Sequence, residues 1–288
     1  MPVPRSFLFV PADSERKLAR GLESRADALI LDLEDSVAAA NRPIARKLAR
    51  EFLEANPAGK IARYVRVNPL ASGLALDDLA ATVAGRPDGI LLPKCMPDDV
   101  RTLDHYLSAF ETASGNLRGA TRIVAIATET AEAVFALGDY KESSPRLEAI
   151  TWGAEDLSAC IGGSNRTIDG AYDGPYLLVR SLCLLAAAAA GVAALDTIYT
   201  DFPDPAGLRA ECAAAKRSGF IGKMAIHPAQ IAAINEAFST SAAERDWAEQ
   251  VVAAFAANPD AGTLALDGKM IDKPHLVLAR RLLGLPAA

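Results

Sequence analysis

Residues 27–35 read DALILDLED, an apolar run that ends abruptly in acids. Its apolar part is continuous rather than alternating, which is typical of a strand covered on both faces. The chain holds eight runs of this kind, which are SFLFVPA (6–12), DALILDLED (27–35), ARYVRVNP (62–69), GILLPK (89–94), RIVAIATE (122–129), LEAITWGAED (147–156), ALDTIYTD (194–201) and GKMAIHP (222–228). Their number and continuity predict eight parallel strands.

Segments with helical periodicity lie between many of these runs. They are SERKLARGLESR, with Ser14 as a predicted N-cap, IARKLAREFLEAN, PDDVRTLDHYLSAFETA, with Pro97 near its start, YLLVRSLCLLAAAAAG, with Gly191 as a predicted C-cap, and DPAGLRAECAAAKRSG. Alternation of eight strands with helices predicts an α/β fold of the (β/α)8 TIM-barrel type. An open doubly wound sheet is the alternative, and its dinucleotide-binding form is disfavoured because no G-x-G-x-x-G follows the first strand.

The predicted barrel does not use the whole chain. We expect a catalytic barrel domain over residues 1–238 and a C-terminal helical extension over 239–288. The extension contains two helical segments, SAAERDWAEQVVAAFAAN and KPHLVLARRLLG, on either side of GTLALDGKMID. Because it lies outside the eightfold pattern, it is interpreted as an oligomer contact or a lid.

Composition narrows the class of protein. The 288 residues are 51% hydrophobic and 23% charged, with a net charge of −6, so we expect a globular protein without a nucleic-acid or membrane partner. The four cysteines and three histidines are scattered, which argues against a zinc site or a disulfide framework. The N-terminal apolar stretch is broken by Pro11 and Asp13, and the longest apolar run, 182–195, is too short to span a bilayer. A cytoplasmic protein is therefore expected.

Charged residues gather at the ends of the predicted strands. The polar residues at these ends are Asp32, Glu34, Asp35, Arg66, Asn68, Lys94, Glu129, Glu155, Asp156, Asp201 and His227. Several have plain structural interpretations: Asp35 and Asp201 could cap helices, Arg66 could pair with Glu34, and His227 precedes a proline. Nevertheless, six of eight strands end in charge, and the ends of barrel strands meet on one face, where barrel active sites lie.

Oxygen ligands without nitrogen or sulfur suit a hard cation such as Mg²⁺ or Mn²⁺. Glu129 and one of Glu155 and Asp156 come from neighbouring predicted strands, so they can share one ion. Arg66 and Lys94 would then meet anionic groups of a substrate, which an acidic protein would otherwise repel.

The chain resembles the citrate lyase β-subunit-like (CitE-like) branch of the HpcH/HpaI aldolase family. The stretches that carry the resemblance are SFLFVPADSERK, ADALILDLEDSV, YVRVNP, LLPK, ATETAEAV, TWGAEDLSACIGG, ALDTIYTDFPDPAGL, GFIGKMAIHPAQI and DGKMIDKPHLVLAR. They occur in family order over nearly the whole chain. The resemblance implies a barrel with a C-terminal helical extension, a homotrimer or hexamer, and Mg²⁺-dependent cleavage or condensation of 3-hydroxyacyl thioesters.

The same resemblance assigns roles to individual residues. It implies Glu129 and Asp156 as metal ligands, and Arg66 and Glu129 as substrate contacts. It also implies Asp272 as an acid/base that reaches the site of a neighbouring subunit. Glu155 is not expected to bind the ion, because neighbours on a strand point to opposite faces.

Three further residues complete the expected site. Glu34 is grouped with the catalytic residues, and Lys94 and Asp32 with the substrate-binding residues, as groups that orient the substrate or its partners. Asp32 and Glu34 share a strand parity, so we expect them to point the same way.

The expected reaction splits a citryl-, citramalyl- or malyl-CoA type thioester into an acyl-CoA and a 2-keto acid. Two alternatives stay open: a metal-dependent aldolase acting on free hydroxy-keto acids, and a β subunit that is active only within a citrate lyase complex on an acyl-carrier-protein substrate. The sequence does not choose the acyl group, because these substrates differ by one small substituent, which a pocket discriminates by only about 1–3 kcal/mol.

Overall fold

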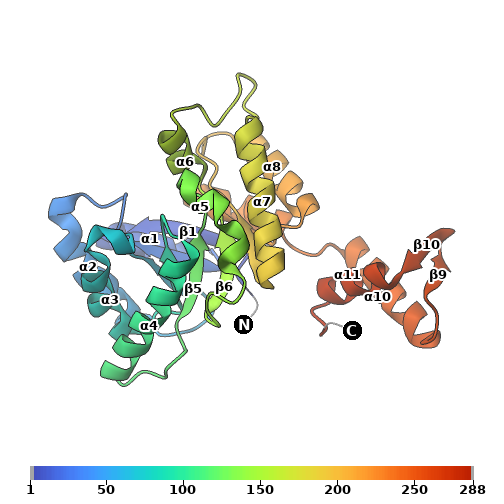
Figure 1. Ribbon diagram of the computed structural model, residues 1–288, viewed down its shortest axis with the longest axis horizontal. Coiled ribbons are helices and arrows are strands. Elements are labelled where there is room, and N and C mark those ends of the chain that lie inside the picture. Colours follow the sequence, from blue (N-terminus) through green and yellow to red (C-terminus); the bar gives the residue numbers. More distant parts are fainter. Residues whose placement is uncertain (1–2, 287–288) are drawn as a thin grey trace. The chain divides into compact units, whose positions relative to one another are not determined.

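The computed structural model describes residues 3–286. The chain divides into two compact units, Met1–Phe238 and Ser239–Ala288 (Figure 1). The first holds eight strands and most of the helices, and the second holds a small helical unit with a hairpin.

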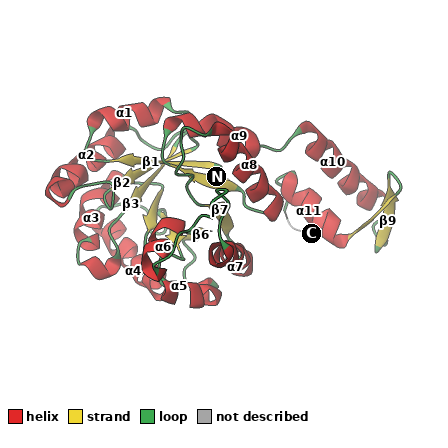
Figure 2. Cartoon of the chain, turned by 90° about the horizontal axis from the view of Figure 1, so that it is seen from above, coloured by secondary structure: helices red, strands yellow, loops and turns green. Residues whose placement is uncertain are grey.

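The strands of the first unit close into a parallel barrel in chain order, β1 to β8, so the predicted (β/α)8 fold is confirmed. The strands are β1 (Ser6–Pro11), β2 (Ala28–Asp32), β3 (Ala62–Arg66), β4 (Gly89–Leu92), β5 (Arg122–Ile126), β6 (Leu147–Thr151), β7 (Ala193–Asp196) and β8 (Gly222–Ala225). Figure 2 shows the helices outside this ring of strands.

The helices of the barrel unit are α1 (Glu15–Glu23), α2 (Arg42–Ala55), α3 (Ala75–Thr82), α4 (Pro97–Ala113), α5 (Ala131–Phe135), α6 (Ala154–Ile161), α7 (Gly174–Ala190), α8 (Pro205–Ser218) and α9 (Ile231–Ala237). Short 3-10 turns occur at Ala39–Asn41, Leu70–Ser72, Val83–Gly85, Leu137–Tyr140 and Pro228–Gln230. Ser14 accepts a hydrogen bond from the backbone N–H of Lys17 and so caps α1, while Gly191 ends α7 in the left-handed conformation. Both predicted caps are confirmed.

Strand residues alternate between the inside of the barrel and the layer beneath the helices. Phe7, Ile30, Val124 and Ala149 belong to a cluster inside the barrel. Ile150, one residue beyond Ala149, belongs to the larger cluster between barrel and helices. Both clusters are apolar, and this is why the strands read as continuous apolar runs.

All eight strands end earlier than the apolar runs that predicted them, and the difference is largest in β6 and β7. β6 ends at Thr151, and α6 begins at Ala154, so Glu155 and Asp156 lie in the first turn of a helix rather than on a strand. β7 ends at Asp196, so Asp201 lies in the following loop. The predicted helical segments did not include α3, α5, α6 or α9, each of which has eight residues or fewer.

The second unit packs two helices and a β-hairpin around its own small core. It consists of α10 (Ala242–Ala257), β9 (Thr263–Leu266), β10 (Lys269–Asp272) and α11 (Lys273–Leu282). The hairpin turn is Asp267–Gly268, with φ of 48° and 74°, the positive values that a two-residue I′ turn requires. Within residues 3–286 no helix is long and apolar enough to cross a membrane.

Candidate active site

A pocket of about 230 Å³ opens at the carboxyl ends of the barrel strands. Its lining combines an apolar wall with acids and one arginine; it comprises Phe9, Pro11, Asp32, Ser36, Arg66, Ile126, Glu129, Thr151, Trp152, Gly153, Ala154, Glu155, Asp156, Thr197, Ile198, Met224 and Ile226. This is the end of the barrel where active sites form. Of the residues predicted for the site, Asp32, Arg66, Glu129 and Asp156 line this pocket, and Lys94 and Glu34 contact them.

Glu129 is the buried acid of the pocket. It follows β5, is only 4% exposed, and accepts a hydrogen bond of 2.5 Å from the backbone N–H of Lys94. Burial and the negative charge of Asp156 raise the pKa of the Glu129 carboxyl to about 8, against the opposing effect of Lys94. A carboxylate kept in this position near a second acid is stabilised by a cation.

Asp156 and Glu155 are adjacent in sequence but have separate partners. Asp156 Oδ1 lies 3.1 Å from Nζ of Lys94. Glu155 instead accepts a hydrogen bond of 2.8 Å from Asn165 in the loop after α6. They diverge because successive residues of a helix point about 100° apart, and not because of strand alternation.

Lys94 joins the acids from several elements. Its backbone is left-handed, with φ of 48°, an uncommon conformation for a lysine. Its N–H binds Glu129, and its Nζ lies 2.5 Å from Glu34 Oε1 and 3.0 Å from Asp35 Oδ2. Burial alone would lower the pKa of the Lys94 ammonium, but Glu34, Glu129 and Asp35 outweigh burial and raise it. Lys94 therefore carries its charge among these acids.

Arg66 is held in place by Asp32. Its Nε and Nη2 each donate a hydrogen bond of 2.7 Å to one oxygen of Asp32, whose Cα is its partner in the β2–β3 register. Its guanidinium also lies 4.8 Å from the centre of the Phe9 ring. Burial would raise the pKa of Asp32, but Arg66 outweighs it and lowers that pKa. The fixed fork leaves Arg66 in one orientation on the pocket wall.

Glu34 lies between the two cations. Its Oε1 contacts Lys94, and its Oε2 lies 2.7 Å from Nη1 of Arg66. The contact with Arg66 is close enough for an ion pair, but its angles are not those of a hydrogen bond. Oε2 is therefore a buried oxygen that accepts no hydrogen bond from residues 3–286. Burial raises the pKa of Glu34, and both cations oppose the rise.

The donor set of the pocket fits a magnesium ion. Glu129 and Asp156 supply carboxylate oxygens, and Mg²⁺ commonly binds one or two protein carboxylates and completes its octahedron with water and substrate. Across residues 3–286 no group of three or more His, Cys, Asp or Glu is arranged to hold a metal. A site built on two carboxylates is compatible with that finding.

Gly153 brings the two acids together. A Cβ at this position would lie 2.6 Å from Cγ of Glu129, closer than real Cβ atoms approach other atoms. Gly153 immediately precedes α6, and its N–H donates a hydrogen bond of 3.1 Å to the hydroxyl of Thr128. Because glycine has no side chain, the first turn of α6 can pack close to the Glu129 side chain. Sequence reasoning quoted this glycine without giving it a role, as it did Phe9 and Thr151, because packing distances leave no signal in residue order.

Asp272 belongs to the second unit. It is the N-cap residue of α11, and its carboxylate lies 2.5 Å from Nδ1 of His275. Its side chain is about one-third exposed. Its role as an acid/base in a neighbouring copy stays a prediction.

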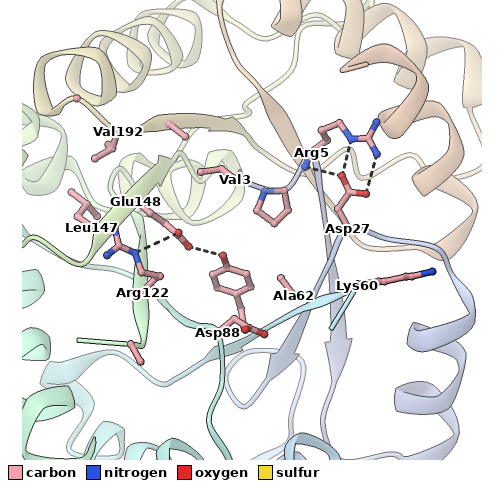
Figure 3. A pocket seen from close by; sticks show the side chains of 15 residues that line it. Val3, Arg5, Asp27, Lys60, Ala62, Asp88, Arg122, Leu147, Glu148 and Val192 are labelled. Carbon is pink, nitrogen blue, oxygen red and sulfur yellow. Dashed lines mark hydrogen bonds and ion pairs between the residues drawn. The ribbon is translucent and has the colours of Figure 1, made fainter. Parts of the chain in front are cut away.

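A larger cavity, of about 1080 Å³, lies at the opposite, amino end of the barrel (Figure 3). Several of its charged side chains are paired. Arg5 binds Asp27 at 2.7 Å, and Glu148 accepts a hydrogen bond of 2.5 Å from Tyr64 and lies 3.6 Å from Nε of Arg122. Size alone does not make it the active site, because the charged groups of the carboxyl end converge on one small pocket instead.

The chain is similar to known proteins over nearly its whole length. The model of the HpcH/HpaI aldolase/citrate lyase family matches residues 5–228. A (3S)-malyl-CoA thioesterase of Cereibacter sphaeroides is 35% identical over 291 residues, covering 97% of this chain and 93% of the relative. The citrate lyase subunit beta of Escherichia coli is 35% identical over 282 residues, covering 97% of this chain and 92% of the subunit.

A solved structure has a similar fold over almost the full length of this chain. The CitE protein of Mycobacterium tuberculosis, crystallised with magnesium, acetoacetate and coenzyme A, superposes with a TM-score of 0.78 at 32% identity and covers 98% of both chains. The structure of a citrate lyase beta subunit from Mycobacterium tuberculosis, complexed with oxaloacetate and magnesium, is 33% identical, covers 82% of this chain and 97% of that chain, and has a TM-score of 0.68.

Proposed function

This chain belongs to the HpcH/HpaI aldolase/citrate lyase family, and from that premise we propose that it is a Mg²⁺-dependent carbon–carbon lyase. Its substrate would be a 3-hydroxyacyl-CoA thioester of the citryl-, citramalyl- or malyl-CoA type, and its products an acyl-CoA and a 2-keto acid. The observation that carries the proposal is the meeting of buried Glu129, Asp156 and the Asp32-held Arg66 in one small pocket.

Glu129 and Asp156 would hold the ion. Bound Mg²⁺ supplies Lewis-acid chemistry, which polarises substrate oxygens and lowers the pKa of a coordinated hydroxyl. The raised pKa of Glu129 supports this assignment, because a carboxyl that burial and Asp156 keep partly protonated near neutral pH gains most from a cation. Magnesium in the relatives' structures supports the choice of metal.

Arg66 would stabilise charge that develops on the substrate. In the proposed cleavage a base takes the proton of the 3-hydroxyl, the hydroxyl carbon becomes the keto carbon, and the bond between C2 and C3 breaks. The electron pair of that bond passes into the thioester as an enolate, which a proton then converts into the acyl-CoA. Arg66 keeps its proton under all working conditions and is already oriented by Asp32, so it offers a preorganised charge-assisted donor.

The proton acceptor is assigned to Asp272. Its partly exposed carboxylate beside His275 is compatible with proton transfer, and the family resemblance implies that it reaches the site of a neighbouring copy. The homo-oligomer that this arrangement needs is part of the proposal. Glu34, with its raised pKa and the buried oxygen that accepts no hydrogen bond within residues 3–286, would orient Arg66 and Lys94.

Hydrolysis of the thioester is the competing activity, since a relative is named a thioesterase. The lining of the pocket favours lysis. Among the described residues, those that line the pocket include no histidine and no cysteine. They therefore offer no nucleophile–base pair of the kind that acyl transfer commonly uses.

One experiment separates these activities. Purified protein with Mg²⁺ is incubated with citryl-, citramalyl- and malyl-CoA, and the products are identified by chromatography and by a thiol reagent. Lysis yields an acyl-CoA and a keto acid without free thiol, whereas hydrolysis yields free CoA and a hydroxy acid. Glu129→Gln and Asp156→Asn should abolish the lysis and weaken Mg²⁺ binding, and Glu155→Gln serves as the matched control.

The outcomes also address the two alternatives left open by the sequence. Turnover of free hydroxy-keto acids, with no reaction of any thioester, would replace the proposal with an aldolase. Reaction only with substrate carried on an acyl carrier protein would indicate a subunit of a larger complex. Full activity of Glu129→Gln or Asp156→Asn would refute the metal assignment.

A further inference from the structure

The hydroxyl of Thr151 is a buried polar group that has no hydrogen-bond partner in the described chain. Thr151 ends β6, is only 1% exposed, and lines the pocket. Its Oγ1 has no hydrogen-bond partner among residues 3–286. Buried hydroxyls in native proteins are nearly always hydrogen-bonded, so one left over in a binding pocket needs an explanation.

The strand fixes the direction of this side chain. Ala149, two residues earlier, faces the inside of the barrel, and strand alternation gives Thr151 the same direction. Its carbonyl accepts a hydrogen bond of 2.9 Å from the N–H of Ala127, so its backbone is held by the neighbouring segment. Its Cα partners across the sheet are Ile126 and Leu195, which are buried and apolar. The hydroxyl therefore faces the pocket from an apolar surround.

Several of the other polar side chains in the lining are already engaged. Both oxygens of Asp32 bind Arg66, and Glu155 binds Asn165. Glu129 and Asp156 are assigned to the ion. Ser36 and Thr197 also bring hydroxyls to the lining, but among the described lining residues Thr151 alone has a buried hydroxyl oxygen without a hydrogen-bond partner.

The size of the pocket decides which end of a substrate reaches Thr151. A volume of about 230 Å³ admits a short acyl group but not coenzyme A, which must stay outside. The thioester then lies toward the mouth, and the part that becomes the keto acid lies deepest. Its carboxylate is the strongest hydrogen-bond acceptor at that end.

We propose that the Thr151 hydroxyl donates a hydrogen bond to the carboxylate of the keto-acid portion of the substrate, and so selects for a 2-keto acid at the base of the pocket. This inference rests on the proposed lyase function. It adds to that function a residue that contacts only one of the two products, so it predicts an effect on one substrate of the reverse condensation and none on the other.

The test compares Thr151→Val, which keeps the shape and removes the hydroxyl, with Thr151→Ser, which keeps the hydroxyl. Binding of glyoxylate and of pyruvate is measured by calorimetry in the presence of Mg²⁺, and KM values for keto acid and for acetyl-CoA are measured in the condensation direction. For Thr151→Val we expect keto-acid affinity to fall about 10- to 100-fold, the range for a lost hydrogen bond to a charged group, with KM for acetyl-CoA unchanged. Thr151→Ser should stay within a few fold of wild type.

Ser143→Ala is the matched control, because Ser143 also carries a buried hydroxyl without a partner in the described chain but precedes β6, at the amino end of the barrel. It should leave both KM values unchanged. If wild type condenses a keto acid with acetyl-CoA but Thr151→Val binds keto acids normally, or loses affinity for both substrates equally, this inference is wrong while the lyase function stands. If wild type neither binds nor condenses any keto acid, the lyase function fails and the inference with it.

Discussion

Replacing Gly153 by alanine tests whether one close contact sets the geometry of the proposed metal site. The added Cβ would lie 2.6 Å from Cγ of Glu129 and 3.4 Å from its Cδ. Carbon atoms in contact are normally about 3.5–4.0 Å apart, so Glu129 or the start of α6 must move by about 1 Å. The backbone at 153, with φ of −117° and ψ of 108°, suits alanine, so the contact alone is the cause.

The expected loss follows from that displacement. Misplacing a catalytic group by about 1 Å can cost about 10²-fold in rate, and overpacking costs about 1–3 kcal/mol of stability. Gly153→Ala should therefore remain folded, bind Mg²⁺ more weakly, and lose about 10²-fold in kcat for thioester cleavage. Calorimetric Mg²⁺ titration, steady-state kinetics and urea denaturation measure these three quantities.

A control glycine distinguishes this contact from a general effect of the substitution. A Cβ at Gly174, the first residue of α7, meets no atom within 4 Å, so Gly174→Ala should keep wild-type Mg²⁺ affinity and kcat. Wild-type Mg²⁺ affinity and rate in Gly153→Ala would refute the reasoning, because Glu129 would then tolerate the displacement or lie outside the metal site.

Asp32→Asn should lower kcat at least tenfold and lower the free energy of unfolding by about 3–5 kcal/mol, because the buried Arg66 loses its bidentate partner. Steady-state kinetics equal to wild type would count against the orienting role of Asp32. Arg66→Lys keeps the charge but loses the fork, and steady-state kinetics should show a loss of about 10²-fold in kcat with Mg²⁺ affinity unchanged. Burial would raise the pKa of Asp196, but Lys223 and Arg180 outweigh it and hold that pKa at about 2, below its unfolded value of about 4. The stability that Asp196 contributes is thus complete above pH about 4 and is lost as the pH falls toward 2, so urea denaturation across that range should show a shallower decline for Asp196→Asn, and an unchanged slope would contradict this account.

The barrel could be predicted from sequence because its physics is repetitive. Each strand is covered inside by other side chains and outside by helices, so each reads as a short continuous apolar run. What the runs could not show was where a strand stops. β6 ends at Thr151 because Gly153 turns the chain into α6, yet the apolar pattern runs on through Trp152, which is itself buried and donates to Asp196 at 2.8 Å.

The membership of the site was more predictable than its pairings. Arg66 ends β3, and Lys94 and Glu129 lie two and three residues after β4 and β5. Barrel topology brings all these strand ends to one face. Arg66 binds Asp32 through Nε and Nη2 because the β2–β3 register pairs the two residues. The residue pattern does not specify this register. The sequence does not single out Thr151, because threonine is common in strands. Its buried hydroxyl is distinguished only by the lack of a hydrogen-bond partner within residues 3–286.

The distribution of charge along the pocket bears on which bond the protein would break. Asp32, Glu129 and Thr151 line the pocket and are buried, and the Arg66 side chain is only 11% exposed. The keto-acid portion of a thioester would lie against these buried groups. Hydrolysis breaks the carbon–sulfur bond, which would lie near the mouth because coenzyme A cannot enter a space of about 230 Å³. Lysis breaks the bond between C2 and C3, which lies two bonds farther along the acyl group and therefore deeper in the pocket. Groups arranged for charge that develops deep in the pocket therefore favour carbon–carbon cleavage, and a thioesterase built on this barrel would need a separately positioned water at the mouth.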